Sequence, residues 1–276
     1  MRTQIALALG LCACLVPSTN VASAALVRAD FNDLSAGSLL DQGGGTGLAG
    51  TWAGSATLEV VANDLTAPAA THFALTQSGT AQMLRGSYDA PRVNNRNLST
   101  PLNGTVWFSF LAQPTSSDTR VGIDVNPTVG SYSPSGARLL AIGTALRVLG
   151  SVPDTWFSNQ FTVGQTSLVL GRIEIDKVGS TDRLSLWVDP DLMNLSEDDA
   201  LHPSSDTDWL SSVSALGIES YRSGGASGDE GIIDLISLAD GPSAFQHVTG
   251  IPEPSTFVIW ALGVLGLIGW RRRRTK

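Results

Sequence analysis

The chain has 276 residues, a formal net charge of −8 and 42% hydrophobic residues, so it is long enough to bury a substantial core. Residues 25–250 hold 24 acidic and 11 basic side chains, a net charge of −13, which disfavours nucleic acid and anionic membrane surfaces as partners. Divalent cations and neutral, hydroxyl-rich polymers fit this charge better.

The N-terminal segment, residues 1–24, is predicted to be a secretory signal peptide. A single basic residue precedes an apolar run from Ile5 to Val16, and the small-residue triplet Ala22-Ser23-Ala24 follows. A basic start, an apolar stretch and an A-x-A site are typical of such a signal. Cleavage is therefore expected between Ala24 and Ala25.

Both cysteines of the chain, Cys12 and Cys14, lie in this segment. The run Leu11-Cys12-Ala13-Cys14 also resembles a lipoprotein signal, in which Cys14 would be acylated, and this alternative stays open. Cleavage after Ala24 would leave a mature protein without cysteine, which excludes disulfides, thiolate metal sites and cysteine nucleophiles.

Residues 25–250 are predicted to form one all-β domain. Short β-prone runs are separated by Gly, Asn, Asp, Ser and Pro, and helical periodicity is scarce. Eight or more such runs predict a two-sheet antiparallel jelly-roll sandwich. The predicted strands are Leu58–Ala62, Gly104–Gln113, Arg120–Val125, Arg138–Gly143, Ser167–Asp176, Arg183–Asp189, Ala215–Ser220 and Ile232–Ala239.

The clearest strand pair is Ser167–Asp176 with Arg183–Asp189. Apolar and polar residues alternate along both runs, which predicts one buried and one polar face. The loop Lys177–Asp182 between them has hairpin length, so the two strands are expected to be paired neighbours. A short helix is predicted at Asp206–Ser214.

Several phrases resemble the concanavalin-like, laminin-G-like jelly-roll domains of exported proteins. The matching phrases are Phe31-Asn32-Asp33, Ala36 to Leu39, Gly43 to Trp52, Val106 to Leu111, Gly171 to Ile173 and Leu184 to Pro190. These are structural residues, so the resemblance implies the fold rather than an activity. The last acidic β-segment, Gly228 to Leu238, departs from the usual sequence pattern of that family.

Glycosidases and binding modules both occur on such sandwiches, so the fold does not distinguish them, and the positions of the acidic residues are the evidence for or against catalysis. Laminarinase-like glycosidases carry Glu-x-Asp-x-x-Glu on one strand; Glu174 and Asp176 match the first two positions, but Gly179 occupies the third. Because retaining hydrolysis needs two carboxyl groups about 5–5.5 Å apart, no catalytic residue is predicted. A Ser-His-Asp triad has no nominated serine, since G-x-S-x-G is absent and the histidines lie far apart at His72, His202 and His247.

Two groups of residues are candidates for ligand binding. An acidic loop over residues 189–208 offers oxygen ligands for calcium, without EF-hand spacing, at Asp189, Asp191, Asp198 and Asp199. Three tryptophans in loop-like sequence are candidate platforms for stacking on a glycan: Trp52, Trp156 and Trp209. Trp107 and Trp187 lie inside predicted strands and are expected in the core.

The C-terminal segment, residues 251–276, combines three elements. Pro252-Glu253-Pro254 comes first, an apolar stretch from Phe257 to Trp270 follows, and the cluster Arg271, Arg272, Arg273, Arg274 ends it. As a helix, the apolar stretch would span about 21 Å, short of the roughly 30 Å hydrocarbon core, so it predicts a marginal single transmembrane helix. The arginines are expected to stay cytoplasmic, which leaves the domain outside the inner membrane.

This order of elements resembles the PEP-CTERM sorting signal. By that resemblance Pro252, Glu253 and Pro254 are recognised by an exosortase, a membrane-embedded, transpeptidase-like enzyme of Gram-negative bacteria that make extracellular polysaccharide. The sequence thus predicts an exported, non-catalytic cell-envelope or extracellular-matrix protein with weak glycan binding. It would be anchored in the inner membrane before processing and lie at the surface or outside the cell afterwards. The alternative is a dedicated lectin-like carbohydrate-binding protein, ahead of a glycoside hydrolase.

Overall fold

The computed structural model describes residues 25–55, 58–75, 82–86, 93–131, 135–150, 154–178, 181–203, 208–222 and 231–251. The expected signal peptide, the Pro-Glu-Pro motif, the apolar segment and the arginine cluster lie outside these ranges. In the part of the chain that is described, no helix is both long and apolar enough to cross a membrane.

One sheet contains eight antiparallel strands. They are β1 (Leu26–Ala29), β2 (Gly37–Ser38), β4 (Leu58–Ala62), β5 (Gln82–Gly86), β7 (Thr105–Pro114), β12 (Ser167–Val178), β13 (Thr181–Val188) and β15 (Gly231–Asp240). Their order is β13-β12-β7-β15-β5-β4-β2, and β1 pairs with the second half of β15.

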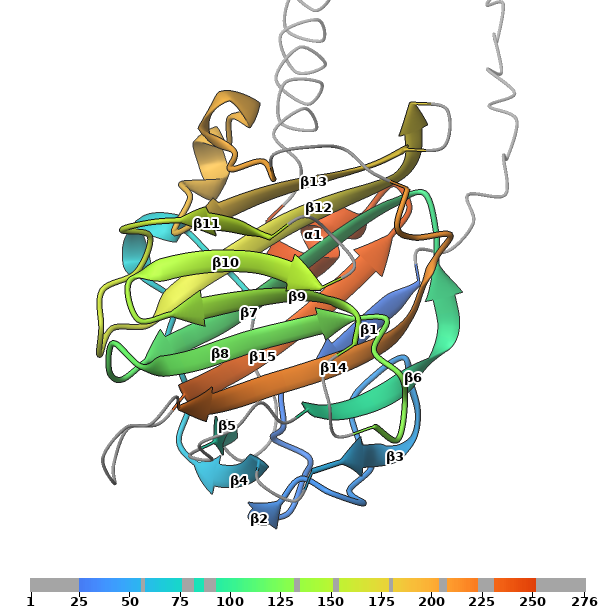
Figure 1. Cartoon of the computed structure of the whole chain (residues 1–276), viewed down its shortest axis with the longest axis vertical. Coiled ribbons are helices and arrows are strands. Elements are labelled where there is room, and N and C mark those ends of the chain that lie inside the picture. Colours follow the sequence, from blue (N-terminus) through green and yellow to red (C-terminus); the bar gives the residue numbers. More distant parts are fainter. Residues whose placement is uncertain are drawn as a thin grey trace, which may run out of the picture.

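The second sheet contains seven antiparallel strands. They are β3 (Leu48–Gly54), β6 (Val93–Leu102), β8 (Thr119–Val125), β9 (Ala137–Ile142), β10 (Ala145–Gly150), β11 (Thr155–Phe157) and β14 (Val213–Arg222). Their order is β11-β10-β9-β8-β14-β6-β3. Figure 1 shows this sheet in front of β7, β12 and β15, so the all-β, two-sheet prediction is confirmed.

The main core lies between the two sheets. Alternate residues along each strand point into it, as the two-residue period of a strand requires. Phe108 and Phe110 of β7 meet Val121 and Ile123 of β8 there, and all four are fully buried. This apolar layer joins the sheets into one sandwich.

A second core covers the outer face of the eight-stranded sheet. It is closed by the helix α1 (Ala244–Thr249) and by a loop with two 3-10 helices, Leu192–Asn194 and Glu197–Asp199. Leu168 and Leu170 of β12 are fully buried beneath this cover. The expected polar face of Ser167–Asp176 is therefore wrong for its first half, because this sheet is covered on both sides.

All eight predicted strands are present, with ends shifted by at most two residues. The paired neighbours Ser167–Asp176 and Arg183–Asp189 are confirmed as β12 and β13, with a register shift between Glu174 and Val178. The predicted helix at Asp206–Ser214 is wrong for its described part. Residues 208–212 are irregular and β14 begins at Val213, because Val213 and Ala215 are buried as strand residues.

Candidate functional site

The C-terminal end of the domain is fixed to the outer face of the eight-stranded sheet. Phe245 and Val248 of α1 are buried in the second core. The Ser109 hydroxyl donates a hydrogen bond to the Val248 carbonyl at 2.6 Å, and the Ala74 N–H donates to the Thr249 carbonyl at 2.9 Å. The short helix is thus held by packing and by bonds from two other segments.

Gly250 and Ile251, the two residues that follow α1, are also held by contacts within the domain. Gly250 ends α1 with φ 76°, and its N–H donates to the Gln246 carbonyl at 2.8 Å. A Cβ there would lie 2.6 Å from the Ala74 carbonyl carbon, so this turn needs glycine. Ile251 is 6% exposed, and its N–H donates to the Thr249 hydroxyl at 3.2 Å. The residue before Pro252 therefore belongs to the folded domain.

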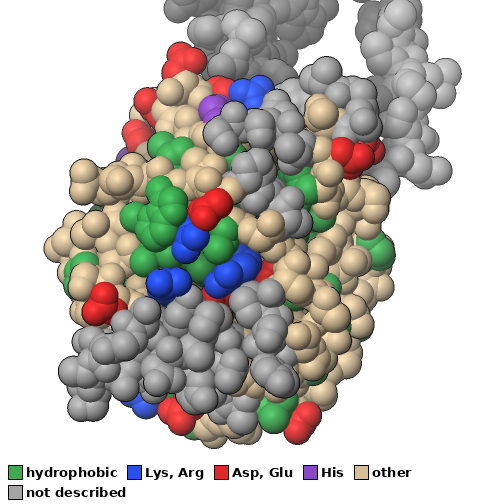
Figure 2. Space-filling view, in the orientation of Figure 1, with side chains coloured by type: hydrophobic (Ala, Val, Ile, Leu, Met, Phe, Trp, Pro, Cys, Tyr) green, Lys and Arg blue, Asp and Glu red, His purple; other side chains and the backbone are tan. Residues whose placement is uncertain are grey.

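The outer face of the seven-stranded sheet carries a cluster of acidic, basic and aromatic side chains. The strand register forms one row across five neighbouring strands. From β14 to β11 the row contains Glu219, Gly122, Leu140, Arg147 and Trp156. Asp124 and Arg138 lie opposite each other in the next row. Figure 2 shows basic, acidic and hydrophobic side chains gathered in the middle of this face.

Two carboxylates of this face are fully buried. Glu219 accepts two hydrogen bonds from the Arg138 guanidinium, one of them at 2.7 Å. Burial raises the pKa of Glu219, and Arg138 opposes the rise. Burial also raises the pKa of Asp124 to about 7, against the hydrogen bond that it accepts from the Ser135 N–H at 3.2 Å. With no exposed area, neither carboxyl group can reach a substrate.

Trp156 is an exposed aromatic residue of the same face. Its side chain is 51% exposed, and the guanidinium carbon of Arg147 lies 4.5 Å from its ring centroid. Arg147 donates two hydrogen bonds to the Asp154 carboxylate, at 2.9 and 2.6 Å, and this contact lowers the pKa of Asp154. A flat ring with charged hydrogen-bonding groups beside it is suited to stack on a sugar ring.

The other predicted glycan contacts differ from Trp156. The expectation for Trp52 is wrong: it is 1% exposed and packs in the main core from β3. Trp209 is half-buried and packs against the same core. Trp187 is buried and Trp107 half-buried in the second core, as expected, with ring centroids 5.8 Å apart.

The four aspartates predicted to bind calcium do not converge among the described residues. Asp189 accepts a hydrogen bond from the Leu168 N–H at 2.7 Å. Asp191 accepts from the N–H of Met193 at 3.0 Å and from the Asn194 side chain at 2.6 Å. Asp189 therefore joins the start of the loop to β12, and Asp191 stabilises the loop itself. Asp198 and Asp199 are exposed in a 3-10 helix.

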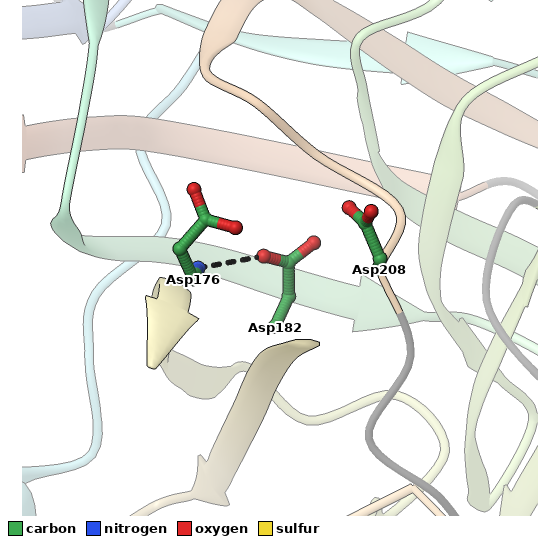
Figure 3. A group of neighbouring side chains, drawn as sticks. All are labelled: Asp176, Asp182 and Asp208. Carbon is green, nitrogen blue, oxygen red and sulfur yellow. Dashed lines mark hydrogen bonds between the residues drawn. The ribbon is translucent and has the colours of Figure 1, made fainter. Parts of the chain in front are cut away.

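Within the described residues, a different acidic group has a spacing that would suit a cation: Asp176, Asp182 and Asp208, with carboxylate oxygens within 4.8 Å of one another. Figure 3 shows Asp182 between the other two. The Asp182 carboxylate is buried and accepts backbone N–H bonds from Asp176 at 3.0 Å, Trp209 at 2.8 Å and Leu210 at 2.6 Å. The hydrogen bonds that the Asp182 carboxylate accepts therefore connect the C-terminal end of β12 with the segment before β14.

The carboxylate considered for glycosidase chemistry, Glu174, is part of an ion-pair network. Arg172 donates to Glu174 at 3.2 Å and to Glu197 at 2.7 Å. The sequence did not reveal a neighbouring arrangement in which the Ser185 hydroxyl donates to Glu197 at 3.1 Å and lies 3.4 Å from His202 Nδ1. Ser185 is fully buried, so it cannot act as a nucleophile on an outside substrate.

Residues 250–274 match the family described as the PEP-CTERM protein-sorting motif. The chain carries a PEP-CTERM sorting signal. This PEP-CTERM segment begins at Gly250, the glycine that ends α1, so folded domain and sorting signal meet without a linker. No curated protein matches the sequence.

Similarity to solved structures is weak. A protein of unknown function from Shewanella oneidensis MR-1 is 9% identical, with coverage of 80% of this chain and 88% of that chain and a TM-score of 0.44. A beta-glucanase catalytic domain from Podospora anserina is 14% identical, with coverage of 80% and 97% and a TM-score of 0.43. The Emp47p carbohydrate recognition domain is 10% identical, with coverage of 78% and 97% and a TM-score of 0.38. At these values neither activity nor ligand transfers to this chain.

Proposed function

We propose that this chain is an exported, non-catalytic component of the cell envelope or extracellular matrix that is sorted through its PEP-CTERM signal. The observation that carries the proposal is the family match over residues 250–274. An exosortase-type enzyme recognises Pro252-Glu253-Pro254 while residues 257–270 hold the chain at the inner membrane. Residues 1–24 are removed during export, and processing then releases the domain to the surface or the medium.

The state of the carboxylates supports a non-catalytic role. Glycoside hydrolysis needs an acid and a base or nucleophile that both contact the substrate. Glu174 is paired with Arg172, whereas Asp124 and Glu219 have no exposed area. Each of these three carboxylates forms a hydrogen bond within the domain, so a structural role accounts for it without catalysis.

Replacement of Pro252, Glu253 and Pro254 by alanine tests the sorting proposal in a native host that has an exosortase. The variant is expected to remain full-length and membrane-retained, whereas the wild type is processed near this site and moves outward. Ser243→Ala is the control, because its side chain makes no capping hydrogen bond at α1. Identical fractionation of the triple variant and the wild type, with a lower melting temperature for the variant, would mean that the motif is structural.

A dedicated carbohydrate-binding function is favoured by one observation, the exposed Trp156 ring beside Arg147. Extracellular polysaccharide purified from the native host is the probe. Trp156→Ala is expected to weaken the affinity about fivefold, since stacking on an aromatic ring contributes about 1 kcal/mol. Met193→Ala, a change at another exposed hydrophobic residue, is the matched control. Equal binding by wild type and Trp156→Ala would remove this face as the glycan site.

A further inference from the structure

The folded domain ends very close to the apolar segment of the sorting signal. Ile251 is buried, and five residues separate it from Phe257. Fully extended, this stretch spans at most about 20 Å. The domain is larger than this tether, because the twelve residues of β12 alone extend over roughly 40 Å. Before processing, the surface around Ile251 therefore faces the membrane at close range.

Among the described residues, two segments contribute to the exposed surface next to Ile251. Ala74 bonds to Thr249 and lies against Gly250, so the segment after the 3-10 helix Ala69–Thr71 borders the end of α1. We name this surface the exit collar; it comprises Phe73, Ala74, Leu75, Gln246 and Gly250. Ala74, Gln246 and Gly250 are exposed, whereas Phe73 and Leu75 are half-buried.

The exit collar is uncharged and has a depression beside it. Phe73 and Leu75 line a cavity of about 310 Å³ together with Leu65, Leu111 and the half-buried Asp64. Whereas residues 25–250 carry a net charge of −13, none of the five collar residues is charged. A partner can therefore cover the five collar residues without desolvating a charged side chain, a costly step in forming an interface, provided that Asp64 of the adjoining cavity stays in contact with water.

We propose that the exit collar is a contact surface for the processing enzyme that recognises Pro252-Glu253-Pro254. Three extended residues span only about 10 Å. A standard protein interface buries about 800 Å² on each partner, which corresponds to a disc roughly 32 Å across. An enzyme centred on the tripeptide thus reaches well beyond it, and the anchored Ile251 places the collar inside that area. The inference rests on the proposed sorting function. It states that the enzyme recognises the exit collar in addition to Pro252-Glu253-Pro254.

Arginine substitutions in the collar test the proposal in the full chain in its native host. Ala74→Arg and Gln246→Arg place a bulky charge on exposed positions, while the backbone bonds of both residues remain. Each is expected to slow processing about tenfold, the effect of roughly 1.4 kcal/mol at an interface. Ala36→Arg, the same change at an exposed alanine beside β2, is the matched control and should be processed at the wild-type rate.

A linker variant separates contact from a folding effect. Twelve Gly/Ser residues inserted after Ile251 add an average span of roughly 20 Å, so the enzyme no longer has to meet the collar. The linker is expected to restore wild-type processing to both arginine variants, whose melting temperatures should equal that of the wild type. Wild-type processing of the arginine variants without the linker would overturn the collar contact, and so would slow processing that the linker leaves unchanged. Either result leaves sorting intact if the triple alanine variant still blocks processing, whereas a processed triple variant would refute the sorting proposal itself.

Discussion

The buried carboxyl group of Asp124 makes the stability of this domain depend on pH. Burial raises its pKa from the ordinary 3.8 to about 7 in the folded state. Between these two values the folded state binds a proton that the unfolded state has lost, so the free energy of unfolding falls as pH rises. A rise of about three pKa units corresponds to about 4 kcal/mol, of which roughly 3 kcal/mol is lost between pH 5 and pH 8.

Asp124→Asn removes the titration and keeps an oxygen that can accept the hydrogen bond of the Ser135 N–H. For a domain of this size, 3 kcal/mol corresponds to a difference of roughly 6–12 °C in melting temperature. Thermal melts of residues 25–251 at pH 5 and pH 8 measure it. The wild type is expected to lose stability over this interval, and the variant to lose much less and to be the more stable protein at pH 8.

Glu219 also has a raised pKa, so some decline with pH should persist in the Asp124→Asn variant. The difference between the two proteins therefore reports the titration of Asp124 together with its charge interaction with Glu219. Asp154 and Asp191 have lowered pKa values and are ionised throughout this interval in both proteins. Parallel stability profiles for wild type and variant, or a wild type that is more stable at pH 8 than at pH 5, would refute the argument.

Three further outcomes are measurable by urea unfolding. Arg138→Met leaves the Glu219 carboxylate buried without its partner and should cost about 3–5 kcal/mol, and Glu219→Leu in the same chain should recover much of that loss. Phe245→Ala empties the space under α1 and should cost about 3–5 kcal/mol. Trp156→Ala should cost about 1 kcal/mol, because half of the residue is in solvent and its contact with the Arg147 guanidinium contributes about 0.5–1 kcal/mol.

The sequence predicted the strands whose side chains alternate or are apolar throughout. β7, β12 and β15 belong to this group. It did not predict β6, Val93–Leu102, because Asn, Arg, Ser and Pro dominate that segment and have low strand propensity. β6 forms because it pairs with β14 on one side and β3 on the other. Such long-range pairing leaves no local sequence pattern.

The same limit applies to the candidate sites. Trp52 follows a glycine-rich stretch that is typical of a loop, but β3 pairs with β6 on both sides of it, and its side chain packs in the main core. Trp156 and Arg147 are nine positions apart in the chain, and the β10–β11 register places them opposite each other. The motif at residues 252–254 was readable because it acts as a local peptide and needs no folded partner to be recognised.

The position of α1 links the folding of the domain to its sorting. A six-residue helix is too short to be stable alone, so α1 exists only while Phe245 and Val248 remain packed on the sheet. Local unfolding of α1 would free the segment up to about residue 243 and lengthen the tether by eight residues, or roughly 27 Å when extended. A docked helix therefore presents the sorting motif at a fixed short distance from the folded surface, whereas an undocked helix presents it on a long flexible chain. Because only the docked form brings the exit collar to the enzyme, collar recognition would favour processing of chains that have completed folding.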